Sequence, residues 1–216
     1  PECQGCKIRA QYPPDVAATA PIPFFGSPRL YTRRANFYQP AEPRWHGASE
    51  FGLSGPSPSR AMMAWLGDPD SLTARLRCKS GNRFSVQILK QAWALPHVTE
   101  RRLLGMANRE WALVREVLLC GAGEPWVFAR SVMPARSLQG DLTRLRKLDR
   151  QPLGHLLFNY PLMQRSPYQF CRMAADALRP EVVTDRGANL WGRRSRFDLA
   201  GRSIMVSEIF LPTFQP

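Results

Sequence analysis

Apolar and polar residues alternate along six stretches of the chain, at residues 83–93, 111–120, 126–134, 166–173, 192–199 and 203–211. Successive side chains of a strand point to opposite faces, so this period of two predicts a strand in each stretch. Short turn sequences join two of the pairs, GAGEP after the second stretch and AGR after the fifth. Such pairs are typical of antiparallel hairpins.

Four short segments between the strands have a helical pattern. The first, residues 69–78, starts with Asp68 and Pro69, and an aspartate N-cap before a proline is a common helix start. The others are residues 99–104, a leucine-spaced helix over 138–148, and an apolar helix within QPLGHLLF (151–158). Residues 174–189 are expected to form an irregular loop. Hairpin strands with helices gathered between them predict an antiparallel α+β domain.

Two charges interrupt the apolar strand WALVREVLLC (111–120). Its alternation places Arg115 on one face and Glu116 on the other, each among apolar neighbours. Burying a guanidinium without a partner is strongly unfavourable. Arg115 therefore reaches water, pairs with a carboxylate, or faces a cavity in which an anion binds.

A single carboxylate stands out in the same way in the strand SIMVSEIFL (203–211), where Glu208 lies on an otherwise apolar face. Opposite charges on two strands of one sheet indicate either a buried ion pair between Arg115 and Glu208 or the two ends of one polar-lined pocket. In the second case the ligand carries an anion at one end and a hydroxyl or acidic proton at the other. An aromatic hydroxy acid has that shape.

Residues 1–58 are rich in proline, serine, glycine and alanine and lack a sustained hydrophobic period. We expect a flexible N-terminal tail there and a folded domain at residues 59–216. The tail contains Cys3 and Cys6, a single CxxC pair. Because no further ligands follow at the spacing that a zinc site needs, no metal site is expected.

The net charge of +13 suits nucleic acid, an anionic membrane surface or an anionic small substrate. No nucleic-acid-binding module is recognisable, and no apolar run reaches the roughly 18 to 20 residues of a transmembrane helix. The five cysteines include three that are scattered singly, unlike the disulfide framework of a secreted protein. We therefore expect a cytoplasmic monomer that binds a small anion and no nucleic acid.

Four motifs occur in order: WLGDPDSLTARLR (65–77), VREVLLCGAGEPWVFARSVMP (114–134), QPLGHLLF (151–158) and LWGRRSRFDLAGRSIMVSEIFLP (190–212). Together they resemble the chorismate pyruvate-lyase family. The resemblance implies a single α+β domain with an antiparallel sheet of about six strands, covered by helices and flaps. It also implies a lyase that eliminates pyruvate from chorismate to give 4-hydroxybenzoate for ubiquinone biosynthesis, with no metal and no organic cofactor.

The same resemblance implies roles for four residues of this chain. Arg115 binds the ring carboxylate of the product, and Glu208 holds its hydroxyl. Leu153 contributes its backbone amide, and Leu72 lines the pocket where some relatives have methionine. Arg115 and Glu208 are thus the expected catalytic residues. The chain departs from the family in its N-terminal tail and in a longer loop before Asn189.

Two questions stay open at this point. Arg193, Arg194 and Arg196 in GRRSRF are candidates for the second carboxylate of chorismate, although a solvated strand edge is the expected role for most of them. The alternative function is a non-catalytic, anion-sensing effector domain like those of bacterial transcription regulators, which have the same fold. Residues 1–60, however, contain no pair of amphipathic helices that could form a helix-turn-helix.

Overall fold

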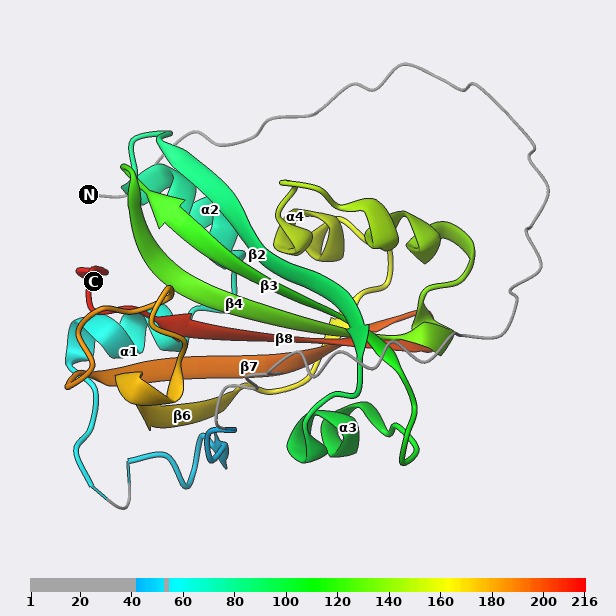
Figure 1. Cartoon of the computed structure of the whole chain (residues 1–216), viewed down its shortest axis with the longest axis horizontal. Coiled ribbons are helices and arrows are strands. Elements are labelled where there is room, and N and C mark those ends of the chain that lie inside the picture. The colour runs from blue at the N-terminus through cyan, green and yellow to red at the C-terminus, as the bar shows by residue number, and fades with distance from the viewer. Residues whose placement is uncertain (1–41, 53–54) are drawn as a thin grey trace. The chain divides into compact units, whose positions relative to one another are not determined.

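A computed structural model describes residues 42–52 and 55–216. In this part of the chain eight strands form one sheet in the order β1-β6-β7-β8-β4-β3-β2, with β5 beside β7, and every pairing is antiparallel. The strands are β1 (His46–Gly47), β2 (Phe84–Ala94), β3 (Ala112–Gly121), β4 (Glu124–Pro134), β5 (Gln164–Arg165), β6 (Gln169–Ala174), β7 (Asn189–Leu199) and β8 (Arg202–Phe210). The six long strands lie side by side (Figure 1) and confirm the predicted α+β class.

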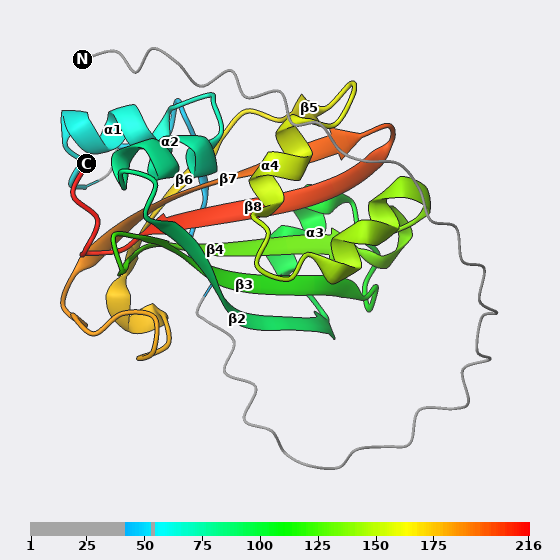
Figure 2. The same cartoon turned by 90° about the horizontal axis from the view of Figure 1, so that it is seen from above.

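Helices cover both faces of the sheet. The α-helices are α1 (Arg60–Leu66), α2 (Leu72–Lys79), α3 (Val98–Leu104) and α4 (Leu153–Phe158), and the 3-10 helices are η1 (Ala135–Ser137), η2 (Gly140–Lys147) and η3 (Ala175–Ala177). Helices α2 and α4 lie over one face, and α3 lies over the other (Figures 1 and 2). We call these the α4 face and the α3 face. Within the described residues, no helix has the length and apolar character needed to cross a membrane.

Strand β3 is buried along its whole length. It lies between β2 and β4 in the sheet, and helices cover it from both sides. Both sets of alternating side chains must therefore pack in an interior, which explains its nearly continuous apolar sequence. The same arrangement forces both Arg115 and Glu116 into the interior, on opposite faces.

Helix α2 begins at Leu72, three residues later than the sequence predicted. The carboxylate of Asp68 accepts the backbone N–H of Asp70 at 2.8 Å, which closes a turn instead of starting a helix. The side chain of Ser71 then caps α2. Asp68 also pairs with Arg75 at 2.5 Å, so the connection between α1 and α2 is tied to the helix that follows it.

The expected leucine-spaced helix consists of 3-10 turns rather than an α-helix. Leu142, Leu145 and Leu148 recur every third residue, which is the repeat of a 3-10 helix. All three are buried in one cluster with residues of α4. Gly140, whose φ of 58° is left-handed, is the first residue of η2, so the chain turns there after η1.

Residues 42–52 belong to the folded part of the chain, although the domain was expected to begin at residue 59. Strand β1 pairs with β6, and Trp45 and Phe51 pack against the core. Thr99 at the start of α3 donates its backbone N–H to the carboxylate of Glu42 at 2.9 Å. Residues 1–41 of the expected tail, which contain its CxxC pair, and residues 53–54 lie outside the described residues.

Helix α1 and the short strands β1 and β5 are not among the predicted elements. Helix α1 has only seven residues and follows a Pro/Ser cluster, but Ser59 caps it by accepting the N–H of Met62 at 3.1 Å. Trp65 and Leu66 at its end are buried in the core cluster over α2. Strands of two residues leave no period in a sequence, so tertiary contacts alone define them.

Candidate active site

A cavity lies between the α4 face of the sheet and helices α2 and α4, and its empty space, counted together with the part open to solvent, is about 640 Å³. Its wall includes all four residues that the resemblance implied, namely Leu72, Arg115, Leu153 and Glu208. They come from α2, β3, α4 and β8, which are far apart in the sequence. The fold therefore brings the expected site residues onto the wall of one pocket.

Arg115 lies in the middle of β3 and is only 2 % exposed. Its guanidinium donates to the amide oxygen of Gln91 at 2.6 Å and to the carbonyl oxygens of Asp149 at 2.6 Å and Gln151 at 3.3 Å. These acceptors are all neutral groups. Burial lowers the pKa of Arg115, and the charge of Asp149 opposes that effect. No carboxylate of the described residues is within ion-pairing distance of this guanidinium.

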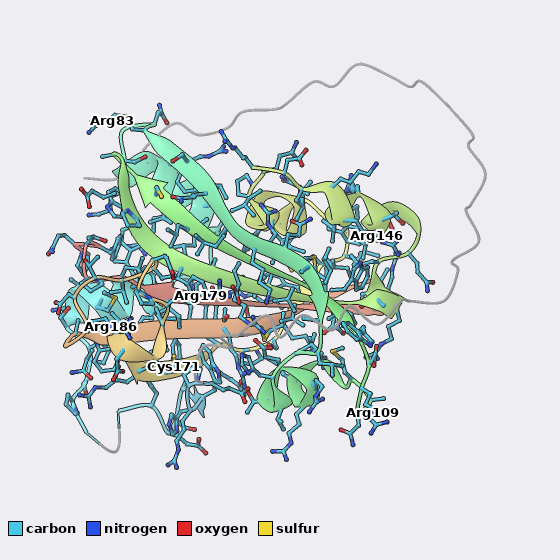
Figure 3. The ribbon with its side chains drawn as sticks, in the orientation of Figure 1. Arg83, Arg109, Arg146, Cys171, Arg179 and Arg186 are labelled. Atoms are coloured by element: carbon cyan, nitrogen blue, oxygen red, sulfur yellow. The ribbon has the colours of Figure 1, made fainter. Side chains whose placement is uncertain are left out.

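A second layer of contacts orients the Arg115 guanidinium. The amide group of Gln91 donates to the carbonyl oxygen of Arg146 at 2.9 Å, and Arg146 is part of η2 (Figure 3). The amide of Gln91 is thus fixed with its oxygen toward Arg115. The cation is rigidly held, while its charge is left for an anion in the cavity.

Glu208 forms an ion pair with Arg193 of β7, at 2.7 Å between Oε2 and Nε. Arg193 also donates through Nη1 to the carbonyl oxygens of Trp65, Leu66 and Asp68, at 3.0, 3.2 and 2.9 Å. Burial lowers the pKa of Arg193, but the charge and hydrogen bond of Glu208 together with the charges of Tyr168 and Asp68 outweigh burial, so the pKa is raised. Glu208 and Arg115 therefore do not pair with each other, which excludes one of the two arrangements considered from the sequence.

Leu72 and Leu153 are the first residues of α2 and α4. The first backbone N–H groups of a helix have no acceptor within the helix, so the amide of Leu153 is suited to a ligand oxygen. A Cβ at Gly154 would lie 3.3 Å from Oγ1 of Thr73. The glycine at this position allows the start of α4 to approach α2 closely, which closes the cavity on that side.

Arg165 and Tyr168 also line the cavity, and the sequence analysis did not single them out. Both are half-buried. The guanidinium of Arg165 donates to the Tyr168 hydroxyl at 2.6 Å, and this hydroxyl donates to the carbonyl oxygen of Asp68 at 2.8 Å. Burial raises the pKa of Tyr168. Nothing in the period of residues 163–168 distinguishes these side chains, since their position depends on the short pairing of β5 with β7.

Glu116 points to the α3 face, away from the cavity, and belongs to a network of charges. Arg130 donates to both carboxylate oxygens of Glu100, at 2.8 and 3.0 Å, and to Glu116 at 2.6 Å. Arg179 (Figure 3) donates to the other oxygen of Glu116 at 3.2 Å. Burial raises the pKa of Glu100, but the hydrogen bonds and charge of Arg130 together with His97 outweigh burial, so this pKa is lowered.

Two of the three arginines in GRRSRF are not at a solvated edge, and the expectation was wrong for these two. Arg193 is in the cavity, and Arg194 is buried on the α3 face beside a second cavity of about 420 Å³. Arg194 donates to Gln169 at 2.8 Å and to Thr99 at 2.7 Å, and burial lowers its pKa to about 10. Arg196 is partly exposed and pairs with Asp198.

The charges of the main cavity indicate the kind of ligand that it suits. The charged residues of its wall are Arg115, Arg165, Arg193 and Glu208, which gives a net formal charge of +2. The rest of the wall is largely apolar, including Val117, Leu157 and Phe197 in a longer set of residues. A small dianion with an apolar ring fits this combination. Within the described residues, no three His, Cys, Asp or Glu side chains are grouped so that they could hold a metal ion.

Comparisons with known proteins identify the family of the chain. A family model described as chorismate lyase matches residues 43–215. The chain is 44% identical over 161 residues to a probable chorismate pyruvate-lyase of Azoarcus sp., covering 71% of this chain and 85% of that protein. It is 42% identical over 171 residues to probable chorismate pyruvate-lyase 2 of Pseudomonas fluorescens, covering 79% and 90%. A solved GntR-family transcriptional regulator of Bacillus cereus matches with a TM-score of 0.49 and 14% identity over 62% of this chain and 96% of that one.

Proposed function

The chain belongs to the chorismate lyase family and has chorismate pyruvate-lyase activity, and from this premise we propose that the cavity on the α4 face is its active site. The observation that carries the proposal is the meeting of Leu72, Arg115, Leu153 and Glu208 on one cavity wall whose net formal charge is +2. Chorismate carries two carboxylates, so its charge complements that of the wall.

The reaction requires positioning more than added chemical groups. The ether bond between the ring and the enolpyruvyl side chain breaks, and its electron pair leaves with the ether oxygen. The ring carbon that bears the hydroxyl loses its hydrogen as a proton, and that electron pair completes the aromatic ring of 4-hydroxybenzoate. The departing enolate takes up a proton on its methylene carbon and becomes pyruvate. Because aromatisation drives the reaction, the protein contributes orientation, exclusion of water and stabilisation of charge.

Arg115 holds the ring carboxylate in this proposal. Its guanidinium is fixed by neutral oxygens of Gln91, Asp149 and Gln151, so its charge is available for a ligand anion. A guanidinium and a carboxylate match in a forked geometry, and each charged hydrogen bond contributes about 1.5 to 3 kcal/mol. The backbone amide of Leu153 adds a second donor, and Leu72 packs against the ring.

Glu208 holds the substrate hydroxyl at the other end of the ring. The hydroxyl and the hydrogen to be lost are on the same carbon, so a carboxylate that accepts the hydroxyl also lies near the departing proton. Arg193 fixes the orientation of this carboxylate through its short contact. Glu208 is thus the group of this wall that is suited to receive the proton.

The state of the cysteines bears on the cellular compartment of the enzyme. Cys120 and Cys171 are buried thiols without a disulfide, as is usual in a reducing compartment. We therefore keep a cytoplasmic monomer with no nucleic-acid partner as part of the proposal. The product would enter the ubiquinone pathway.

The test is turnover of chorismate by the purified full chain in the presence of a metal chelator. We expect equal amounts of pyruvate and 4-hydroxybenzoate, measured by a coupled lactate dehydrogenase assay and by absorbance. Glu208→Gln keeps the size of the side chain but removes its charge, so kcat should fall clearly while 4-hydroxybenzoate binding weakens less. Tight binding of small anions without release of pyruvate would instead favour an anion-sensing domain.

A further inference from the structure

Three guanidiniums line the main cavity, and two of them have partners or roles already described. Arg193 is neutralised by Glu208, and Arg115 is directed toward the ring carboxylate in the proposed function. Arg165 is the third. It is half-buried at the cavity wall, and none of the carboxylates in the described ranges is within ion-pairing distance of it.

The position of Arg165 is set by an aromatic side chain. Its Nη1 donates to the Tyr168 hydroxyl at 2.6 Å, and its guanidinium carbon lies 4.3 Å from the centroid of the Tyr168 ring. Tyr168 is itself fixed, because its hydroxyl donates to the carbonyl oxygen of Asp68 at 2.8 Å. These contacts hold the cation in place without neutralising it.

Arg165 lies on the Glu208 side of the cavity. The guanidinium carbon of Arg193 is 4.6 Å from the centroid of the Tyr168 ring, and Arg193 contacts Glu208 at 2.7 Å. The Tyr168 ring therefore has Arg165 and the Arg193–Glu208 pair as near neighbours. In chorismate the carbon that bears the enolpyruvyl ether is next to the carbon that bears the hydroxyl. A substrate whose hydroxyl is at Glu208 thus has its side-chain carboxylate in this same region.

We propose that Arg165, positioned by Tyr168, binds the carboxylate of the enolpyruvyl side chain, the one that leaves with pyruvate. This inference rests on the proposed function, which places the ring carboxylate at Arg115. The wall then matches the two charges of the substrate with two cations that have no carboxylate partner, one for each end. Arg193 takes no part in this match, since Glu208 already neutralises it.

The assignment gives the two cations different ligands after the reaction. The product 4-hydroxybenzoate keeps the ring carboxylate and has lost the side chain. Arg115 contacts both chorismate and 4-hydroxybenzoate, whereas Arg165 contacts chorismate but not 4-hydroxybenzoate. Arg165 is therefore a residue that distinguishes a dicarboxylate substrate from its monocarboxylate product, and it favours binding of the substrate in the presence of product.

The experiment compares chorismate turnover and 4-hydroxybenzoate binding in the full chain and in Arg165→Gln and Arg165→Ala. In both variants we expect kcat/KM for chorismate to fall by about 10- to 100-fold, mainly through KM. The calorimetric affinity for 4-hydroxybenzoate should stay unchanged. Arg165→Lys keeps the charge but loses the fork, so it should recover part of kcat/KM.

The control is Arg144→Ala, which removes one exposed arginine of η2 and reports the effect of the overall positive field. We expect it to leave both chorismate turnover and product affinity near wild type. Equal losses for chorismate and 4-hydroxybenzoate in folded Arg165→Gln would overturn the inference, and so would an unchanged kcat/KM. If wild type releases no pyruvate from chorismate, the proposed function is wrong and this inference with it. Active wild type with unaffected Arg165 variants contradicts only the role of Arg165.

Discussion

Arg115 and Glu116 are neighbours in β3, and they are 2 % and 1 % exposed, yet their partners are of opposite kinds. On the α3 face, Glu116 and Glu100 meet Arg130 and Arg179, so that carboxylates and guanidiniums are equal in number. On the α4 face, Arg115 is bound by neutral oxygens. The charges of the Glu116 network balance one another without a ligand, whereas Arg115 on the α4 face keeps a positive charge that a ligand can neutralise.

The difference shows how a buried charge can be interpreted. Burial alone does not separate a structural ion pair from a binding site, since both residues of β3 are equally buried. The identity of the hydrogen-bond acceptors separates them. A guanidinium that is oriented by amide and carbonyl oxygens can still bind an anion. A guanidinium that contacts two carboxylates is already neutralised and binds no further anion.

The largest expected effect is on the α3 face. Glu116→Gln places an amide between Arg130 and Arg179 and leaves excess buried positive charge, which should lower the free energy of unfolding by about 3 to 5 kcal/mol. Urea denaturation measures the loss. Glu124→Gln, at an exposed glutamate of β4, is the control and should have little effect. A similar small effect for both variants would mean that the network does not stabilise the fold.

Arg115→Ala tests the other side of the same strand. Here we expect 4-hydroxybenzoate to bind more weakly by about 2 to 5 kcal/mol, because its carboxylate loses its counter-ion in a buried site. The melting temperature should change much less than in Glu116→Gln, since no carboxylate of the chain is stranded. Isothermal calorimetry and thermal unfolding on the same samples separate the two effects. Unaltered affinity in a folded variant would contradict the assignment of the cavity.

A smaller effect should follow from shortening the chain at its N-terminal end. A chain that starts at residue 56 lacks β1, Trp45 and Phe51, which pack on the core, and should lose about 2 kcal/mol relative to one that starts at residue 40. This corresponds to a melting temperature lower by roughly 4 to 8 °C. Equal melting temperatures would show that residues 42–52 contribute nothing to stability.

The smallest effect concerns acid. The pKa of Glu100 is lowered in the folded protein, because Arg130 and His97 together outweigh burial. In the unfolded protein the pKa of a glutamate is about 4.3, so the ion pair of Glu100 stabilises the fold at pH values above this. This stability is lost as the pH falls through the lower, folded pKa. The difference in unfolding free energy between wild type and Glu100→Gln should therefore shrink as the pH is lowered below about 5. A difference that is independent of pH would contradict this linkage.

Much of the fold could be predicted from local patterns. The period of two in residues 111–120 and 203–211 gave the correct faces for Arg115, Glu116 and Glu208, because side-chain direction in a strand is a local property. Helix α1 could not be predicted, since its seven residues are stabilised by the burial of Trp65 and Leu66 against distant strands. Tertiary packing overrides propensity in such short segments.

From the residue pattern alone, a residue of the candidate site could be predicted only where it is a single charge on an otherwise apolar strand face. Glu208 is a single acid on an apolar face, but its partner Arg193 belongs to a run of arginines whose individual roles depend on neighbours across the sheet. Arg165 is less predictable still. It reaches the cavity because the two-residue strand β5 pairs with β7 and because Tyr168 holds it. Such contacts between distant segments leave no local signal.

Arg193 has a consequence for which substitutions the chain can accept. The Nε atom of Arg193 donates to the carboxylate of Glu208. Its Nη1 atom donates to three carbonyl oxygens at the end of α1 and in the connection to α2. Lysine carries the same charge, but its donors come from a single nitrogen and cannot reach in both directions. Even the conservative substitution Arg193→Lys therefore cannot replace these contacts. Such a change would disturb both the connection between α1 and α2 and the orientation of the Glu208 carboxylate.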